Sequence, residues 1–291
     1  MPSADMHTGE IISAIERLDL GEIRLMEVCG THTMSIAKSG LRSMLPKNIK
    51  LLSGPGCPVC VTPPEVIDAV LELAMEKDVI ITTYGDMLRV PGSTPGDSLQ
   101  RRRAMGARVQ MVYSPVDAVQ LAKENPDKEI VFFAIGFETT APVHLMALKE
   151  AIRRGLPNFS ILTSLFTVPP AIEAILSDPE SKVNGFLTAG HVCAITGNRA
   201  YHRLAAHYKI PMVVTGFEPV DLLYGIYRCV SQLEAGSYEV ENAYKRAVPE
   251  QGNAAARQLM DEMLEPCDQD WRGIGIIPSS GLQLRSEYKR Y

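Results

Sequence analysis

The chain has 291 residues, of which 46% are hydrophobic and 22% charged, and its formal net charge is -5. This composition is typical of a globular protein long enough for two domains, and its mild acidity gives no reason to expect nucleic acid or an anionic membrane surface as a partner. No apolar run approaches the roughly 20 residues that span a bilayer, and the first ten residues lack the regions of a signal peptide. We therefore expect a cytoplasmic protein whose six cysteines stay reduced and form no disulfide framework.

Short apolar strands alternate with amphipathic helices along most of the chain. The predicted strands are Arg24–Val28, Lys50–Ser53, Val79–Thr83, Arg108–Tyr113, Ile130–Ile135, Ser160–Leu165, Val183–Thr188 and Pro211–Thr215. The predicted helices are Ile11–Leu20, Ser35–Leu45, Pro64–Glu76, Ser98–Met105, Pro115–Lys123, Pro142–Arg154, Pro170–Leu176, Asn198–Tyr208, Pro219–Ala235 and Tyr238–Leu264. This alternation predicts an α/β fold, in which parallel sheets are flanked by helices on both faces.

A weak internal repeat relates two parts of this pattern. Pro63-Pro64 and Pro169-Pro170 each begin a predicted helix, and Pro115-Val-Asp117 corresponds to Pro219-Val-Asp221, at offsets of 106 and 104 residues. We therefore predict two similar lobes, residues 50–126 and 127–236, with a cleft between them. Residues 1–49 form N-terminal helices and a strand–turn, and residues 237–291 form a helical and extended C-terminal segment.

Cys57-Pro-Val-Cys60 follows the predicted strand Lys50–Ser53. Two residues between thiols allow the pair to form a disulfide or to share a metal ion. We expect Thr62 to cap the next helix, with Glu65 completing a capping box, so that Cys60 lies just before a helix N-terminus that stabilises a thiolate. The pair is thus a redox-pair candidate, although two buried structural cysteines would give the same pattern.

Cys29-Gly-Thr-His32 follows the first predicted strand. A thiolate is a nucleophile, a redox group and a soft-metal ligand. Thr31 offers a hydroxyl, and His32 could orient a ligand or lower the pKa of the thiol. An inert Cys29 and a structural His32 are the alternatives.

Two further strand ends carry candidate residues. Gly136-Phe-Glu-Thr-Thr140 follows an apolar strand, which places Glu138 and Thr139 at a carboxyl end, where α/β proteins bind ligands. Glu138 is alternatively a solvated loop residue. His191 occupies the comparable place one strand later, as a site residue or a structural histidine. His144 is expected to be an exposed or packing residue.

Four motifs in this order resemble the HypD family of [NiFe]-hydrogenase maturation factors: Glu27-Val-Cys-Gly-Thr-His32, Gly54-Pro-Gly-Cys-Pro-Val-Cys60, Gly136-Phe-Glu-Thr-Thr140 and Gly190-His-Val192. Trp271-Arg-Gly273 and Ile277-Pro-Ser-Ser-Gly-Leu282 are similar to that family too, so the resemblance runs from about residue 9 to the end.

The resemblance implies a scaffold on which iron acquires two cyanides and one carbon monoxide, with a small HypC-type partner and a HypE-type cyanide donor. The finished Fe(CN)2CO unit passes to the hydrogenase large subunit. Cys29 would be the iron ligand, flanked by Thr31 and His32, and Cys57 and Cys60 the redox pair. Glu138, Thr139 and His191 would line the cleft.

Two departures from the family pattern are visible. The family usually continues into a cysteine-rich segment that binds a [4Fe-4S] cluster, whereas Cys267 alone lies near this end. The chain is either truncated or a divergent member without the cluster. In addition, Met34 stands where family members often have another histidine.

Two other functions fit the residues. A thiol–disulfide oxidoreductase would use Cys57 and Cys60, with Cys29 as the resolving thiol. A small-molecule binding protein would use the cleft without chemistry at the thiols.

Overall fold

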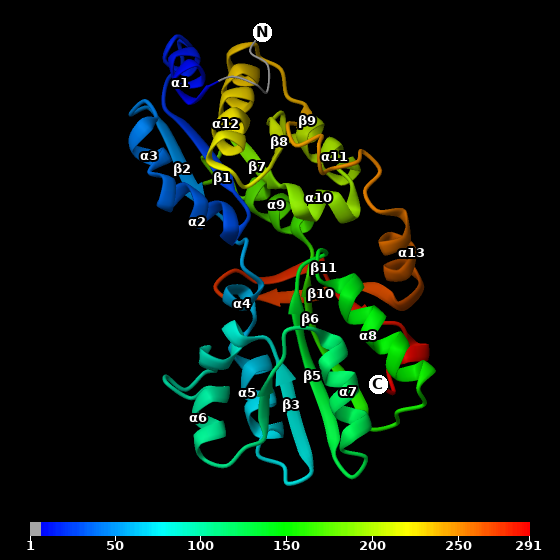
Figure 1. Ribbon diagram of the computed structural model, residues 1–291. Coiled ribbons are helices and arrows are strands. Elements are labelled where there is room, and N and C mark those ends of the chain that lie inside the picture. Colours follow the sequence, from blue (N-terminus) through cyan, green and yellow to red (C-terminus); the bar gives the residue numbers. More distant parts are fainter. Residues whose placement is uncertain (1–6) are drawn as a thin grey trace. The chain divides into compact units, whose positions relative to one another are not determined.

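The computed structural model describes residues 7–291, and the chain divides into two compact α/β units. The first unit contains the chain up to Cys57 together with Val168–Arg257, and the second contains Pro58–Thr167 together with Gln258–Tyr291. Each unit is therefore built from two separate stretches of chain, whereas the sequence-based boundaries follow one another along it. The predicted α/β class, with parallel sheets flanked by helices, is confirmed (Figure 1).

The sheet of the first unit is wholly parallel and has the strand order β2-β1-β7-β8-β9. Its strands are β1 (Ile23–Glu27), β2 (Ile49–Ser53), β7 (Gly185–Ala189), β8 (Met212–Thr215) and β9 (Val240–Asn242). Its helices are α1 (Thr8–Glu16), α2 (Gly30–Ser39), α3 (Leu41–Met44), α9 (Val168–Ser177), α10 (Gly190–Thr196), α11 (Arg199–Tyr208) and α12 (Pro219–Glu234). Ile11 and Ile15 of α1 pack with Leu222 and Ile226 of α12 and with Leu25 of β1, so α1 and α12 cover the sheet together.

The sheet of the second unit has the order β10-β11-β6-β5-β3-β4. Strands β3 (Val79–Thr83), β4 (Val109–Met111), β5 (Glu129–Gly136) and β6 (Phe159–Phe166) are parallel, and the antiparallel hairpin of β10 (Leu264–Trp271) and β11 (Gly275–Leu284) pairs with β6. The helices are α4 (Pro58–Val61), α5 (Pro64–Leu73), α6 (Leu99–Ala104), α7 (Pro115–Glu124) and α8 (Ala141–Arg153), with short 3-10 turns η1 (Gly85–Arg89) and η2 (Ser286–Tyr288). Helix α13 (Ala254–Met263) contains the boundary between the units.

Strand β5 shows why an uninterrupted apolar run predicts a central strand. Its alternate side chains enter two separate cores: Ile130 and Phe132 pack with residues of α7 and α8, whereas Val131 and Phe133 pack with residues of α5 and α6. Because successive side chains of a strand point to opposite faces, both faces of β5 are buried.

The internal repeat corresponds to one order of elements in each unit. In the second unit α5 is followed by β3, then by helical turns, β4 and α7; in the first unit α9 is followed by β7, α10, α11, β8 and α12. The two strands pair directly in both cases, with Ile81 opposite Val109 and Leu187 opposite Val213.

Several predicted element boundaries are wrong. Helix α2 begins at Gly30, five residues before the predicted start, and its N-cap is Cys29, which makes no side-chain capping hydrogen bond. The predicted helix Tyr238–Leu264 is instead β9, an irregular stretch and α13, and the chain then enters β10.

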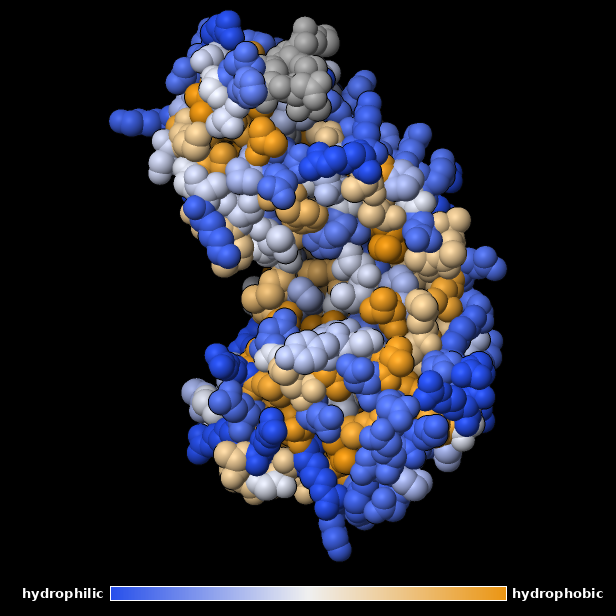
Figure 2. Space-filling view, viewed as in Figure 1, coloured by the Kyte–Doolittle hydropathy of each residue, from blue (hydrophilic) through white to orange (hydrophobic). Residues whose placement is uncertain are grey.

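The space-filling view shows apolar residues in small groups among hydrophilic ones on the viewed face (Figure 2).

Candidate functional site

Cys29 lies where β1 ends and α2 begins in the first unit. Its backbone is extended, and its side chain is 3% exposed. The backbone N–H of Cys29 donates to Oε2 of Glu27 at 3.1 Å, and the hydroxyl of Thr33 donates to Oε1 of the same carboxylate. Glu27, itself 1% exposed, therefore fixes the strand-to-helix turn that carries the thiol.

The loop that carries Cys57 packs directly on this turn. The N–H of Gly54 donates to the carbonyl of Glu27 at 2.8 Å, and the N–H of Gly30 donates to the carbonyl of Gly56 at 2.9 Å. A Cβ at Gly56 would overlap the backbone of Cys29, so only glycine allows this approach. A Cβ at Gly30 would lie 3.6 Å from Cβ of Cys57. Cys29 and Cys57 are therefore neighbours.

Two histidines share one aromatic ring beside the same turn. The rings of His32 and His191 each lie 4.9 Å from the ring of Phe217, which follows β8. His32 is completely buried, and burial and the nearby His191 lower its pKa to about 4, against smaller opposing contributions from the carbonyls of Gly216 and Thr215. Among residues 7–291 neither ring nitrogen of His32 has a partner with hydrogen-bond geometry. Burial also lowers the pKa of His191.

Electrostatics keep the Cys29 thiol protonated. Burial raises its pKa, and the backbone N–H groups of His32 and Thr31 and the hydroxyl of Thr31 offset that shift only in part. The prediction that His32 lowers the pKa of the thiol is therefore wrong for the imidazole ring, because the ring is buried and neutral. Burial likewise raises the pKa of Glu27, against the hydrogen bonds from Thr33 and Cys29. A metal ion that binds such a thiol must displace its proton.

An open hollow of about 400 Å³ lies on the exposed side of α2. It is lined by Thr31, Met34, Ser35, Lys38, Ser39 and Pro219. Thr31 is exposed, and Met34, at the position where the resemblance leads one to expect histidine, is 55% exposed. The hollow thus begins two residues after the buried thiol.

Cys60 belongs to the second unit, where it is exposed on α4. The hydroxyl of Thr62 donates to the carbonyl of Pro58 at 2.8 Å, and the N–H of Arg272 donates to the carbonyl of Val61 at 2.8 Å. The prediction that Thr62 and Glu65 form a capping box for the next helix is therefore wrong: the N-cap of α5 is Pro63, without a side-chain cap. Cys60 lies inside α4 instead of at the start of α5.

Glu138 and Thr139 follow β5 in the second unit, and Glu138 is 3% exposed. The alternative of a solvated loop residue is therefore wrong for Glu138. The preceding Phe137 belongs to an aromatic cluster with Phe166 and Trp271, whose ring centres lie 4.8–6.1 Å apart. The indole N–H of Trp271 donates to the hydroxyl of Ser280 at 2.7 Å. The two C-terminal motifs thus support the segment that carries Glu138.

The structure divides the candidate residues between the units. Cys29, Thr31, His32, Cys57 and His191 lie in the first unit, and Cys60, Glu138 and Thr139 lie in the second. The first set is held together through the contacts of Gly30, Gly56 and Phe217.

Two contributors to the site carry no assigned role in the sequence analysis. Glu27 holds the turn, and Phe217 packs against both histidines. Phe217 follows the carboxyl end of β8, as Cys29 follows β1, so the rule that sites gather at strand ends marks its position but not its contacts with the histidines.

Within residues 7–291 no group of three or more His, Cys, Asp and Glu side chains is arranged to hold a metal ion. Cys267 has no cysteine set around it there, so a [4Fe-4S] cluster does not fit the described residues. No helix in this part of the chain is long and apolar enough to cross a membrane.

The fold and the first-unit site define an α/β protein with a buried thiol at a strand-to-helix turn, beside a second thiol and two neutral histidines. The family model described as "HypD: Hydrogenase formation hypA family" matches residues 7–291, and the chain belongs to this family. It is 44% identical over 270 residues to the hydrogenase maturation factor HypD of Escherichia coli, covering 92% of this chain and 72% of that protein. It is 45% identical over 273 residues to HypD of Rhizobium leguminosarum bv. viciae, covering 91% and 71%.

Proposed function

We propose that this chain acts in hydrogenase maturation as the scaffold on which an Fe(CN)2CO unit is assembled, with Cys29 as its protein ligand to iron. The observation that carries the proposal is the Cys29 turn: a thiol kept protonated by burial, next to Cys57 and to a histidine whose ring nitrogens have no partner of hydrogen-bond geometry in the described chain. Such a thiol is a poor nucleophile until a metal takes the place of its proton. Low-spin iron with cyanide and carbonyl ligands suits a thiolate.

In this proposal iron is the cargo, and one chain supplies only part of its ligands. Cys29 binds iron through Sγ, and a cysteine of a HypC-type partner supplies the second protein ligand. The hollow along Thr31 and Met34 is the open side from which such a partner approaches. His32 and His191, both neutral, each have one ring N–H that donates a hydrogen bond to a cyanide nitrogen without adding charge.

Cys57 and Cys60 supply electrons in the same proposal. A HypE-type donor carries cyanide as a thiocyanate, and release of cyanide from sulfur requires two electrons. Two thiols of this chain become a disulfide, the thiocyanate becomes a thiol and a cyanide ion, and one proton is released. The spacing of two residues between the cysteines and the exposure of Cys60 support this role.

Infrared spectroscopy tests the proposal on the protein co-expressed with HypC-type and HypE-type factors. We expect bands of iron-bound carbon monoxide and cyanide in the native complex and their loss in Cys29→Ala. Cys229→Ala, which removes another buried thiol of the first unit, is the matched control and should keep the bands. Bands that survive in Cys29→Ala would overturn the assignment of the ligand.

The redox step has its own test. In Cys57→Ser we expect iron to bind but the cyanide bands to be lost. Normal assembly in Cys57→Ser would remove the electron-donor role and leave Cys29 as ligand. A dithiol of measurable potential in a protein that never binds iron would instead support a thiol–disulfide oxidoreductase.

A further inference from the structure

Strand β2 is an edge of the first unit's sheet. In the part of the chain that the structure describes, it pairs with β1 alone. The N–H of Ile23 donates to the carbonyl of Asn48, and the N–H of Gly54 donates to the carbonyl of Glu27, both at 2.8 Å. In a parallel pair the backbone groups of alternate residues face the partner strand. The even-numbered residues of β2 therefore face β1, and the N–H and C=O of Leu51 face away from it.

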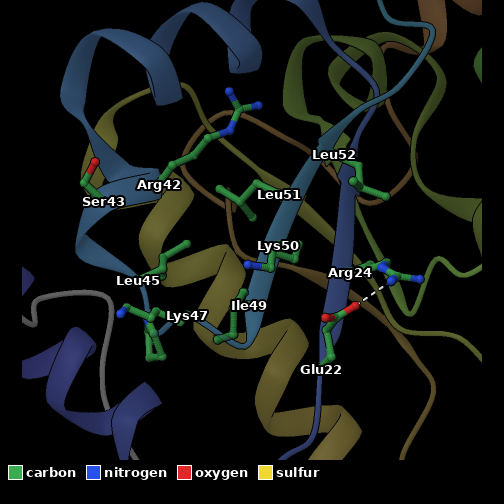
Figure 3. A pocket seen from close by; sticks show the side chains of 11 residues that line it. Glu22, Arg24, Arg42, Ser43, Leu45, Lys47, Ile49, Lys50, Leu51 and Leu52 are labelled. Atoms are coloured by element: carbon green, nitrogen blue, oxygen red, sulfur yellow. Dashed lines mark ion pairs between the residues drawn. The ribbon is translucent and has the colours of Figure 1, made fainter.

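A basic hollow of about 680 Å³ lies along this edge. Figure 3 shows the side chains that line it, which come from α3 and the turn after it, from β2 and from the start of β1. Its charged residues are the cations Arg24, Arg42, Lys47 and Lys50 and a single carboxylate, that of Glu22. Glu22 is already paired with Arg24 at 2.5 Å.

The hollow also has an apolar part. Leu45, Ile49, Leu51 and Leu52 contribute to its lining, and Leu51 and Leu52 are only partly buried. Within residues 7–291 Arg42, Lys47 and Lys50 form no ion pair, and these cations beside partly covered leucines contrast with a chain whose net charge is -5. The charge of the patch is therefore local, and it favours an anionic occupant.

We propose that the β2 edge binds an extended acidic segment of a partner protein, which adds as a strand beside β2. The open backbone groups of Leu51 supply the pairing, the leucines receive apolar side chains, and Lys47 and Lys50 contact acidic ones. A second copy of this chain is a poor occupant, because pairing through β2 would bring like charges together. The site uses no residue of the Cys29 turn, so it goes beyond the proposed iron scaffold.

The first test uses a fluorescein-labelled peptide of alternating valine and glutamate, and fluorescence anisotropy at low salt. We expect Lys50→Glu to weaken binding about tenfold, since it replaces an attraction by a repulsion. Lys182→Glu makes the same charge change at an exposed position of the same unit outside the hollow and should leave the affinity within about twofold. If both variants weakened peptide binding equally, the binding site would not lie at the β2 edge.

A second peptide separates strand addition from simple charge attraction. N-methylation at alternate residues removes backbone donors but keeps every side chain and charge. We expect this peptide to bind at least about tenfold more weakly. Equal binding of both peptides, or no binding of either, would overturn the proposal. So would a dimer of the chain that Lys50→Glu abolishes, because the occupant would then be a second copy.

Discussion

Each unit carries a fully buried histidine in the helix that follows a strand, and the two histidines differ in their hydrogen-bond partners. His32 in α2 and His144 in α8 are both 0% exposed, and burial lowers both pKa values to about 4. His144 has one partner, because its Nε2 lies 3.1 Å from the hydroxyl of Tyr84, while its Nδ1 has none of hydrogen-bond geometry in residues 7–291. His32 has none with hydrogen-bond geometry in residues 7–291 and packs against Phe217 instead.

The difference separates a structural histidine from a candidate functional one. A buried polar group without a partner costs free energy of folding, and in residues 7–291 His32 leaves both ring nitrogens in that state whereas His144 leaves only Nδ1. His144 completes a core in which Tyr84 and Phe132 surround it. His32 stands three residues from Cys29, and in the described chain neither of its ring nitrogens has a partner of hydrogen-bond geometry.

The glycines at the two strand ends give the largest expected effect. In Gly56→Ala the new Cβ would overlap the backbone of Cys29, which the turn holds in place. In Gly136→Ala it would overlap the hydroxyl of Thr140, a side chain that can rotate. We expect Gly56→Ala to lower the free energy of unfolding by about 3 kcal/mol or more, and Gly136→Ala by less. Urea unfolding measures both, and Gly21→Ala, with open space around its Cβ, is the control.

Acid titration gives the next effect, because folding favours the neutral imidazole of His144. Its pKa falls from 6.5 to about 4 on folding, so its contribution to stability is full above pH 6.5 and is lost as the pH falls toward the folded value. Between about pH 7.5 and about pH 5 we expect His144 to account for a loss of about 2 kcal/mol. Urea unfolding at both pH values should show His144→Leu losing that much less stability than the native chain. If the native chain and His144→Leu lost equal stability between the two pH values, His144 would not be the group responsible.

The smallest effect is a contrast between two matched substitutions at neutral pH. His144→Leu leaves the partly buried hydroxyl of Tyr84 without its partner and should cost about 1–2 kcal/mol. His32→Leu removes no hydrogen bond of that geometry and should stay within about 1 kcal/mol of the native chain. Thermal unfolding measures both. A His32→Leu protein as unstable as His144→Leu would show that His32 is structural.

The sequence predicted well what depends on local pattern. The apolar run of β5 and the repeat of helices with proline in the first turn were sufficient for the α/β class, because both are patterns within one short segment. The sequence predicted poorly what depends on distant pairing. Strand β10, which contains Pro266 and alternates exposed and partly buried residues, is extended because β11 pairs with it. The early start of α2 was missed because its N-cap, Cys29, is not a residue that usually caps helices.

The candidate site shows the same limit. Motif spacing placed Cys29, His32 and Cys57 at strand ends, but the roles of Glu27 and Phe217 follow only from the fold. Phe217 lies 188 residues beyond Cys29 in the chain, and no local sequence pattern relates the two. The direction of the pKa shift of the Cys29 thiol could not be predicted from the sequence either, because burial in the folded unit is its main cause.

The position of β1 between β2 and β7 has a consequence for how the chain is made. The N–H of Arg24 in β1 donates to the side chain of Asn184, which is 160 residues away. Contacts between such distant residues slow folding, because the ends of a long loop must meet before they are stabilised. During synthesis Cys29 and Cys57 leave the ribosome long before His191 and Phe217 do. The surroundings of the Cys29 thiol are therefore complete only once the chain has been translated through β8 and Phe217.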